Sequence, residues 1–228
     1  MAPMDWSAIG LSLRLATATT LILLVIGVPL AAWLALSHRR GRWIVDAIVA
    51  LPIVLPPTVL GFYTLVALGS QSPIGQMYEA ITGRTLVFSF QGLLIASVLY
   101  SLPFAVQPFA AAFASVDPNL IETAWSLGAS RSRTFARVIV PLARPGIVTG
   151  MVLSFAHTMG EFGVVLMVGG NLPGSTRTVS ISIYDDVQAL NYMRAGRTAA
   201  LLLAFSFVVL AITYRLQRRS GRAWPIGS

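Results

Sequence analysis

The segment IETAWSLGASRSRTFARVIVPLARPGI, residues 121–147, is a polar passage that carries four arginines. It lies in a chain of 228 residues that is 56% hydrophobic and only 11% charged. On both sides of it the apolar residues form runs that are too long for the core of an ordinary soluble protein. The sequence therefore predicts a membrane protein with one unusually long polar loop.

Five apolar runs have the length that a membrane-spanning helix needs. A hydrocarbon layer about 30 Å thick is crossed by roughly 20 helical residues at about 1.5 Å each. Runs of this size cover residues 9–36, 44–68, 88–114, 145–168 and 195–216. We predict an all-α membrane protein with about five transmembrane helices, formed by a single transmembrane domain over residues 1–228.

All sixteen basic residues of the chain are arginines, and most lie beside the apolar runs. Basic residues concentrate in the cytoplasmic loops of membrane proteins, so this pattern indicates topology rather than nucleic-acid binding. It places the N-terminus outside and the C-terminus in the cytoplasm. Eleven of the arginines then share the cytoplasmic side: Arg39, Arg40, Arg42, Arg131, Arg133, Arg137, Arg144, Arg215, Arg218, Arg219 and Arg222.

The polar passage has the signals of a short helical hairpin. Asp117 and Pro118 are typical of an N-cap and the first helical position, and Gly128 is typical of a helix end. We expect Leu120, Ile121, Ala124 and Leu127 to share one face of this first helix. Ser130 is expected to cap a second helix, which carries Phe135, Val138 and Ile139 and which Pro141 interrupts.

Three interpretations of the loop were weighed. A solvated connection is usually only a few residues long, whereas this loop spends about 25 residues on capped helices with an apolar face. A DNA-binding helix-turn-helix lacks a third helix here, and both of its ends are held by membrane spans. Docking into the groove of a cytoplasmic partner fits best.

The loop resembles the cytoplasmic EAA loop of ABC importer membrane subunits. The resemblance rests on Glu122-Thr123-Ala124, on Gly128 and on the later VIVPLARPGI; Thr123 departs from the alanine that is usual there. It implies the MetI-like ABC importer permease fold, with residues 117–144 as coupling loop and a separate ATPase as partner. The chain has no lysine, so it cannot form its own P-loop, and we expect no enzyme activity. The implied ATPase-coupling residues are Leu120, Ile121, Glu122, Ala124, Leu127 and Gly128.

Three further segments narrow the resemblance to the molybdate and sulfate group of permeases. They are LPIVLPPTVLGFYTLVALG (51–69), HTMGEFGVVLMVGGNLPGSTRT (157–178) and ISIY (181–184). The Pro-Gly-x-Thr-Arg-Thr run favours molybdate, and tungstate is too similar in charge and size to be separated from it. Sulfate or thiosulfate is the alternative substrate.

An oxyanion path must bind its cargo weakly enough to release it, so few charges are expected to line it. Candidate lining groups lie where prolines and glycines disturb helical hydrogen bonding: Pro56, Pro57, Thr58, Gly160 and Gly163. Two intramembrane residues, His157 and Glu161, are interpreted as structural. We expect Glu161 to bond to backbone or to Arg14, and no metal site or cofactor is expected.

Five helices enclose a pathway poorly, so a homodimer is expected in the lipid of a bacterial cytoplasmic membrane. The resemblance also implies an extracytoplasmic molybdate-binding protein, which would dock on the outer loops 70–84 and 169–194. Within the second loop, residues 178–193 are expected to form a short surface helix or a re-entrant piece rather than a sixth span. The rival classes are a secondary transporter, a channel and a membrane-embedded enzyme. A secondary transporter should show paired repeats and buried carboxylates, and neither is evident. A channel would conduct passively in a reconstituted bilayer. An enzyme would need a catalytic cluster, for which Glu161 with His157 is the only candidate.

Overall fold

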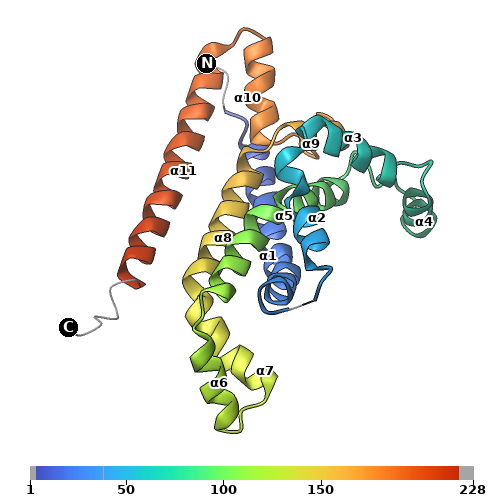
Figure 1. Cartoon of the computed structure of the whole chain (residues 1–228). Helices are drawn as coiled ribbons and strands as arrows, with labels where there is room; N and C mark the ends of the chain where they lie inside the picture. Colours follow the sequence, from blue (N-terminus) through green and yellow to red (C-terminus); the bar gives the residue numbers. More distant parts are fainter. Residues whose placement is uncertain (1–3, 38, 221–228) are drawn as a thin grey trace.

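The computed structural model describes residues 4–37 and 39–220, and all regular structure within them is helical (Figure 1). Arg222, one of the arginines used to predict topology, lies outside these residues. The helices are α1 (Trp6–Leu36), α2 (Arg42–Val54), α3 (Pro57–Leu68), α4 (Pro73–Thr82), α5 (Phe90–Ala114), α6 (Pro118–Ser126), α7 (Arg131–Thr134), the π-helix η1 (Phe135–Ile139), α8 (Val140–Gly160), α9 (Gly163–Gly169), α10 (Val179–Gln188) and α11 (Tyr192–Ser220).

Four helices of the described chain are long and apolar enough to cross a membrane. They are α1, α5, the continuous helix Arg131–Gly160 and the Tyr192–Arg215 part of α11. The pair α2 and α3 would make a fifth span, but it is bent by 112°. The prediction of about five spans is confirmed, whereas the second and fourth runs are not single straight helices. The ten-residue α10 takes the place of the predicted short helix.

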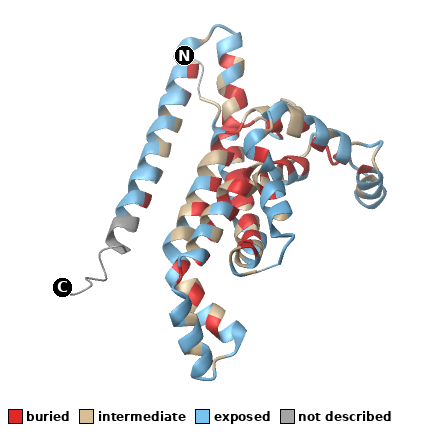
Figure 2. Ribbon diagram, in the orientation of Figure 1, coloured by how far each residue is buried: buried red, intermediate tan, exposed pale blue. Residues whose placement is uncertain are grey.

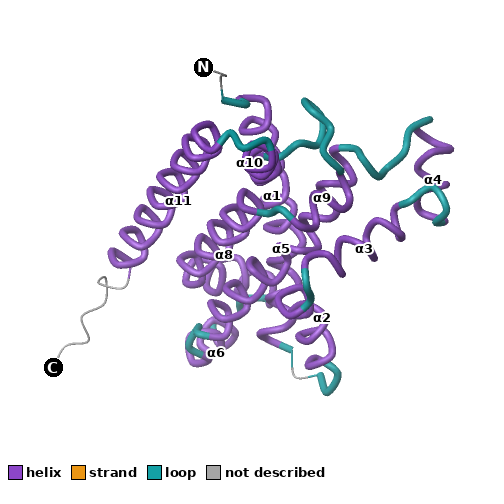
Figure 3. The backbone as a smooth tube through the Cα atoms, turned by 90° about the horizontal axis from the view of Figure 1, so that it is seen from above, coloured by secondary structure: helices purple, strands orange, loops and turns teal. Residues whose placement is uncertain are grey.

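Helices α1, α5 and α8 form the core of the bundle. Seen from above, they lie at the centre, with α11 on one side and α3 and α4 on the other (Figure 3). Gly146 and Gly150 form a GxxxG pair on α8, and a Cβ on Gly150 would lie 2.5 Å from the ring of buried Phe109 in α5. Small residues at this spacing allow helix backbones to approach closely within a membrane. Buried residues accordingly concentrate in these helices, while α11 and α4 are mostly exposed (Figure 2).

The predicted interruption at Pro141 is wrong. The helix that begins at Arg131 continues through η1 and α8 to Gly160. A proline inside an α-helix lacks the amide hydrogen and clashes with the carbonyl four residues earlier. The wider π turn Phe135–Ile139 directly precedes Pro141 and makes room for its ring, so the chain stays helical. The fourth span therefore extends beyond the bundle as a rigid stalk, with α6 and α7 at its far end (Figure 1).

Candidate functional site

The sharp bend between α2 and α3 follows from the sequence Leu55-Pro56-Pro57. A residue that precedes a proline is driven out of the helical region into extended conformations. Leu55 and Pro56 each precede a proline, and their ψ angles are 136° and 137°. Pro57 then begins α3, where its missing amide hydrogen costs nothing. Two consecutive prolines thus end one helix and start the next in a new direction.

A second break separates α8 from α9. Glu161 leaves the helix with a ψ of 136°, and Phe162 has a φ of −129° before α9 begins at Gly163. The amide of Glu161 makes only a long bond of 3.4 Å to the carbonyl of Thr158. The fourth apolar run is therefore divided at Glu161 and Phe162, beside the glycines where the sequence predicted disturbed hydrogen bonding.

The two breaks meet in space. A Cβ placed on Gly163 would lie 2.7 Å from the Cβ of Pro57, and one on Gly61 would lie 2.8 Å from the Cβ of Met167. Helices α3 and α9 therefore pack directly on each other through two glycines, and both begin at the same place. Beside this joint is a cavity of about 620 Å³. It is lined by Pro57, Thr58, Tyr100, Ala156, His157, Gly160, Glu161, Phe162 and Gly163.

Four of the five path candidates predicted from the sequence line this one cavity: Pro57, Thr58, Gly160 and Gly163. Pro56 lies at the bend but is not among the lining residues. Tyr100 of α5 lines the cavity as well and was not anticipated. Its position in a long apolar run gave no signal that its face of α5 turns toward the two breaks.

His157 is packed and hydrogen-bonded on the last turns of α8. Its ring stacks on Phe104 with centroids 3.9 Å apart and lies 4.8 Å from the ring of Tyr100. Its Nδ1 lies 3.0 Å from the hydroxyl of Ser101. Three residues of α5 therefore fix the position and plane of the imidazole.

The expected hydrogen bond between Glu161 and backbone or Arg14 is not formed. Glu161 is 4% exposed, and neither carboxyl oxygen meets hydrogen-bond geometry with a described residue, although the hydroxyl of Ser97 lies near enough to act on the carboxyl group. Arg14 instead places its guanidinium 4.5 Å from the centroid of the Phe90 ring. A buried carboxyl group without a partner is costly, because nothing replaces the water that it loses.

The coupling loop has the predicted caps. Asp117 accepts a 2.9 Å hydrogen bond from the amide of Asn119 and so caps α6. At the other end Gly128 has a φ of +79°, and its amide bonds to the carbonyl of Trp125. The amide of Ala129 bonds to the carbonyl of Ala124, which completes a Schellman motif. These local bonds hold α6 rigidly at the end of the stalk.

The residues predicted for one face of α6 differ in exposure. Ile121 packs against the helix core, and Ala124 is half-buried. Leu120 is 47% exposed, and Leu127, at the C-cap of α6, is 83% exposed. Trp125, which the sequence analysis missed, is 48% exposed. The end of the stalk therefore leaves three large apolar side chains exposed for a partner.

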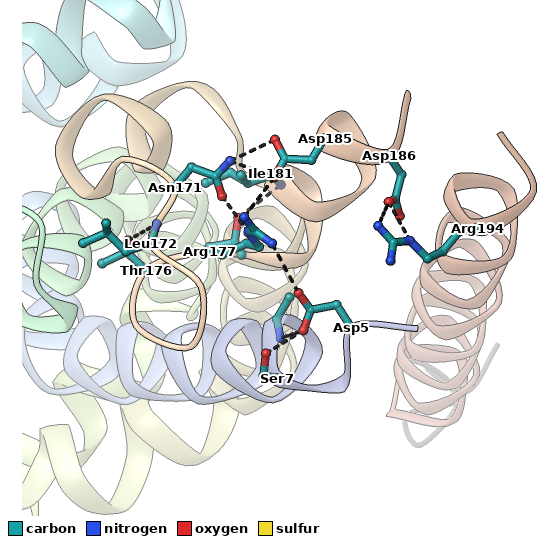
Figure 4. A network of polar contacts seen from close by, with 12 residues as sticks. Asp5, Ser7, Asn171, Leu172, Thr176, Arg177, Ile181, Asp185, Asp186 and Arg194 are labelled. Atoms are coloured by element: carbon teal, nitrogen blue, oxygen red, sulfur yellow. Dashed lines mark hydrogen bonds and ion pairs between the residues drawn. The ribbon is translucent and has the colours of Figure 1, made fainter. Parts of the chain in front are cut away.

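A polar network at the opposite end of the bundle joins segments that are distant in sequence (Figure 4). Arg177 donates a 2.7 Å hydrogen bond to Asn171 and forms ion pairs with Asp5 at 3.9 Å and Asp185 at 3.4 Å. It thereby ties the chain before α1 to the loop after α9 and to α10. On the other side of α10, buried Asp186 pairs with Arg194 of α11. No spacing in the sequence indicates these partners.

Asp5 also caps α1 by accepting a 3.0 Å hydrogen bond from the amide of Ala8. Partial burial of the carboxyl group acts to raise its pKa, but bonds from Ser7 and Ala8 and the charge of Arg177 act in the opposite direction. The net effect is a pKa below the usual value. The ionised form of Asp5 therefore stabilises this end of the fold.

The chain matches the family described as "Binding-protein-dependent transport system inner membrane component" over residues 27–222. It belongs to this family. The permease has the fold and the membrane location that the coupling-loop resemblance implied. The predicted location in the inner membrane is thereby confirmed.

Curated relatives cover nearly the whole permease. It is 51% identical to the molybdenum transport system permease protein ModB of Azotobacter vinelandii, over 94% of this chain and 95% of the relative. It is 34% identical to ModB of Escherichia coli strain K12, over 96% and 97%. A probable sulfate transport system permease protein of Chlorokybus atmophyticus is 35% identical over 91% of this chain and 72% of its own length.

Two solved structures share the fold. One is a bacterial ABC transporter that imports alginate, with a TM-score of 0.77 and 20% identity over 96% of this chain and 80% of the other. The other is the inward-facing methionine ABC transporter MetNI, with a TM-score of 0.72 and 17% identity over 95% of each chain. The predicted MetI-like ABC permease fold is confirmed.

Proposed function

We propose that the chain is the membrane-spanning subunit of an ABC importer that moves molybdate into the cytoplasm, driven by a separate ATPase. The similarity to molybdenum permeases over nearly the full length supports this substrate. The observation that carries the proposal is the meeting of two helix breaks at one cavity. None of the described residues that line it is an arginine. A lining without a fixed positive charge suits a path that must release its dianion.

The coupling surface consists of the exposed apolar side chains of Leu120 and Trp125 in α6 and of Leu127 at its C-cap, together with exposed Glu122. Ile121, Ala124 and Gly128 shape and orient α6 rather than contact the ATPase. Because the stalk is one helix from Arg131 to Gly160, a displacement of α6 is transmitted to the end of α8. That end is the α8–α9 break at the cavity, so nucleotide-driven movement below reaches the path directly.

A second copy of the chain completes the path in a homodimer, with the N-terminus outside and the C-terminus inside. An extracytoplasmic binding protein docks on the outer loops 70–84 and 169–194 and delivers the oxyanion. Within the break, His157 and Glu161 set the shape of the wall, and Pro56 sets the bend between α2 and α3.

Sulfate is the second candidate cargo, because sulfate permeases are also more than 30% identical to this chain. The test is to purify the chain with its partner ATPase and to measure ATP hydrolysis with the cognate binding protein. We expect stimulation by molybdate and tungstate and little by sulfate. Stimulation by sulfate alone would replace molybdate with the second candidate, and failure of any ATPase to co-purify would contradict the assignment.

A further inference from the structure

The tautomer of His157 follows from counting the hydroxyl hydrogens around it. The hydroxyl of Thr158 donates its single hydrogen to the carbonyl of Ser154 at 2.9 Å. Its contact with Ser101 at 2.9 Å must therefore use the hydrogen of Ser101. With that hydrogen spent, the 3.0 Å contact between Ser101 and Nδ1 of His157 requires the imidazole to be the donor.

A neutral imidazole carries one hydrogen, so hydrogen on Nδ1 leaves a lone pair on Nε2. No described residue forms a hydrogen bond with Nε2, and His157 lines the cavity. Stacking on Phe104 keeps the ring in this plane. Nε2 of His157 is thus a hydrogen-bond acceptor in the cavity wall. The oxygens of an approaching oxyanion are also only acceptors. Two lone pairs repel each other unless a proton lies between them.

We propose that His157 is a cargo-contacting, specificity-determining residue that holds the oxyanion through a proton shared between Nε2 and an oxyanion oxygen. This inference rests on the proposed function. The cavity takes up one dianion together with one proton, which enters from the aqueous phase on the side of cargo entry. The other titratable groups at the cavity, Tyr100 and Glu161, supply no positive charge in its place.

A shared proton also discriminates between cargoes of the same charge. Molybdate and tungstate are stronger bases than sulfate, so they hold a proton against Nε2 more firmly. Tetrahedral dianions differ little in size and net charge, so these properties separate their binding free energies only weakly. A hydrogen bond that one dianion forms well and the other forms poorly separates them more. His157 thereby favours molybdate over sulfate without a fixed charge in the path.

The tautomer is read directly by nitrogen NMR on the purified full-length chain, labelled with ¹⁵N-histidine, in lipid nanodiscs. The chain has two histidines, and the variant His38→Gln assigns the signals of His157. We expect hydrogen on Nδ1. Thr158→Val removes the hydroxyl that accepts the hydrogen bond from Ser101. The hydroxyl hydrogen of Ser101 can then be donated to Nδ1 of His157, and the ring hydrogen should move to Nε2. Thr17→Val, which loses a similar bond to Leu13 far from the ring, should change nothing. Hydrogen on Nε2 in the unaltered protein would overturn the proposal.

The functional consequence is tested with the transporter assembled from permease, ATPase and saturating binding protein in liposomes. The rate of molybdate uptake should increase by up to about tenfold when pH is lowered by one unit. This is the pH dependence expected when one proton is taken up with each molybdate. In His157→Gln this pH dependence should vanish and the preference for molybdate over sulfate should shrink. An unchanged pH dependence and preference in His157→Gln would refute the proposal. Absence of uptake by the unaltered transporter would instead contradict the proposed function, and the NMR measurement does not depend on it.

Discussion

The joint between α3 and α9 gives the sharpest prediction, because its geometry depends on a missing methyl group. In Gly163→Ala the new Cβ would lie 2.7 Å from the Cβ of Pro57, about 0.7 Å inside the 3.4 Å at which ordinary contact begins. The proline ring is rigid and begins α3, so it has no rotamer with which to move aside. One of the two helices must shift, and overpacking of this kind costs about 1–3 kcal/mol.

A protein of this size loses about 2–4 °C of melting temperature per kcal/mol. We therefore expect Gly163→Ala to melt roughly 2–12 °C below the unaltered protein, as followed by tryptophan fluorescence of the purified chain in detergent. The matched control is Gly160→Ala at the same break, where an added Cβ meets nothing within 4 Å. Adding Pro57→Gly to Gly163→Ala removes the opposing Cβ and should recover part of the loss. Equal melting of Gly163→Ala and Gly160→Ala would refute the close approach of the two helices.

Three further perturbations test other parts of the structure. Leu127→Asp, at the most exposed apolar residue of α6, should abolish co-purification with the ATPase and leave the melting temperature unchanged; retained binding would contradict the coupling surface. Asp5→Asn should lower the melting temperature at neutral pH, because the lowered pKa means that the ionised form stabilises the fold. This contribution is present above the usual aspartate pKa and is lost as pH falls through the lower folded value, so the two proteins should converge in acid; a constant difference would refute the pairing with Arg177. Asp186→Ala leaves Arg194 without its buried partner and should lower the melting temperature more than Asp5→Asn does, an order that differential scanning calorimetry checks.

Local signals in the sequence predicted much of the fold. The caps at Asp117 and Gly128 depend only on neighbouring residues, and so does the disturbed helical hydrogen bonding at Pro56 and Pro57, although the 112° bend there was not predicted. The lengths of the apolar runs and the positions of the arginines likewise reflect only the surrounding membrane and no contacts between distant residues. Such features are set by backbone chemistry within a few residues, which is why a single sequence was enough to predict them.

Features that depend on contacts between distant segments were missed or wrong. Pro141 was expected to stop a helix, but the π turn before it is visible only in the folded chain. Arg14 was expected near Glu161 and instead lies over Phe90. The partners of Arg177 come from the N-terminal segment and from α10, which no spacing rule connects. The GxxxG pair at Gly146 and Gly150 is a sequence signal of the core packing that was not used for the prediction.

The central claim is that the chain translocates its cargo only when another protein hydrolyses ATP. Its most direct test is uptake of radiolabelled molybdate into liposomes that contain the purified chain, with and without the ATPase, with the binding protein and ATP supplied to the appropriate sides. We predict accumulation against a gradient only when the ATPase and ATP are both present. Uphill accumulation by the chain alone, driven by an ion gradient, would contradict it.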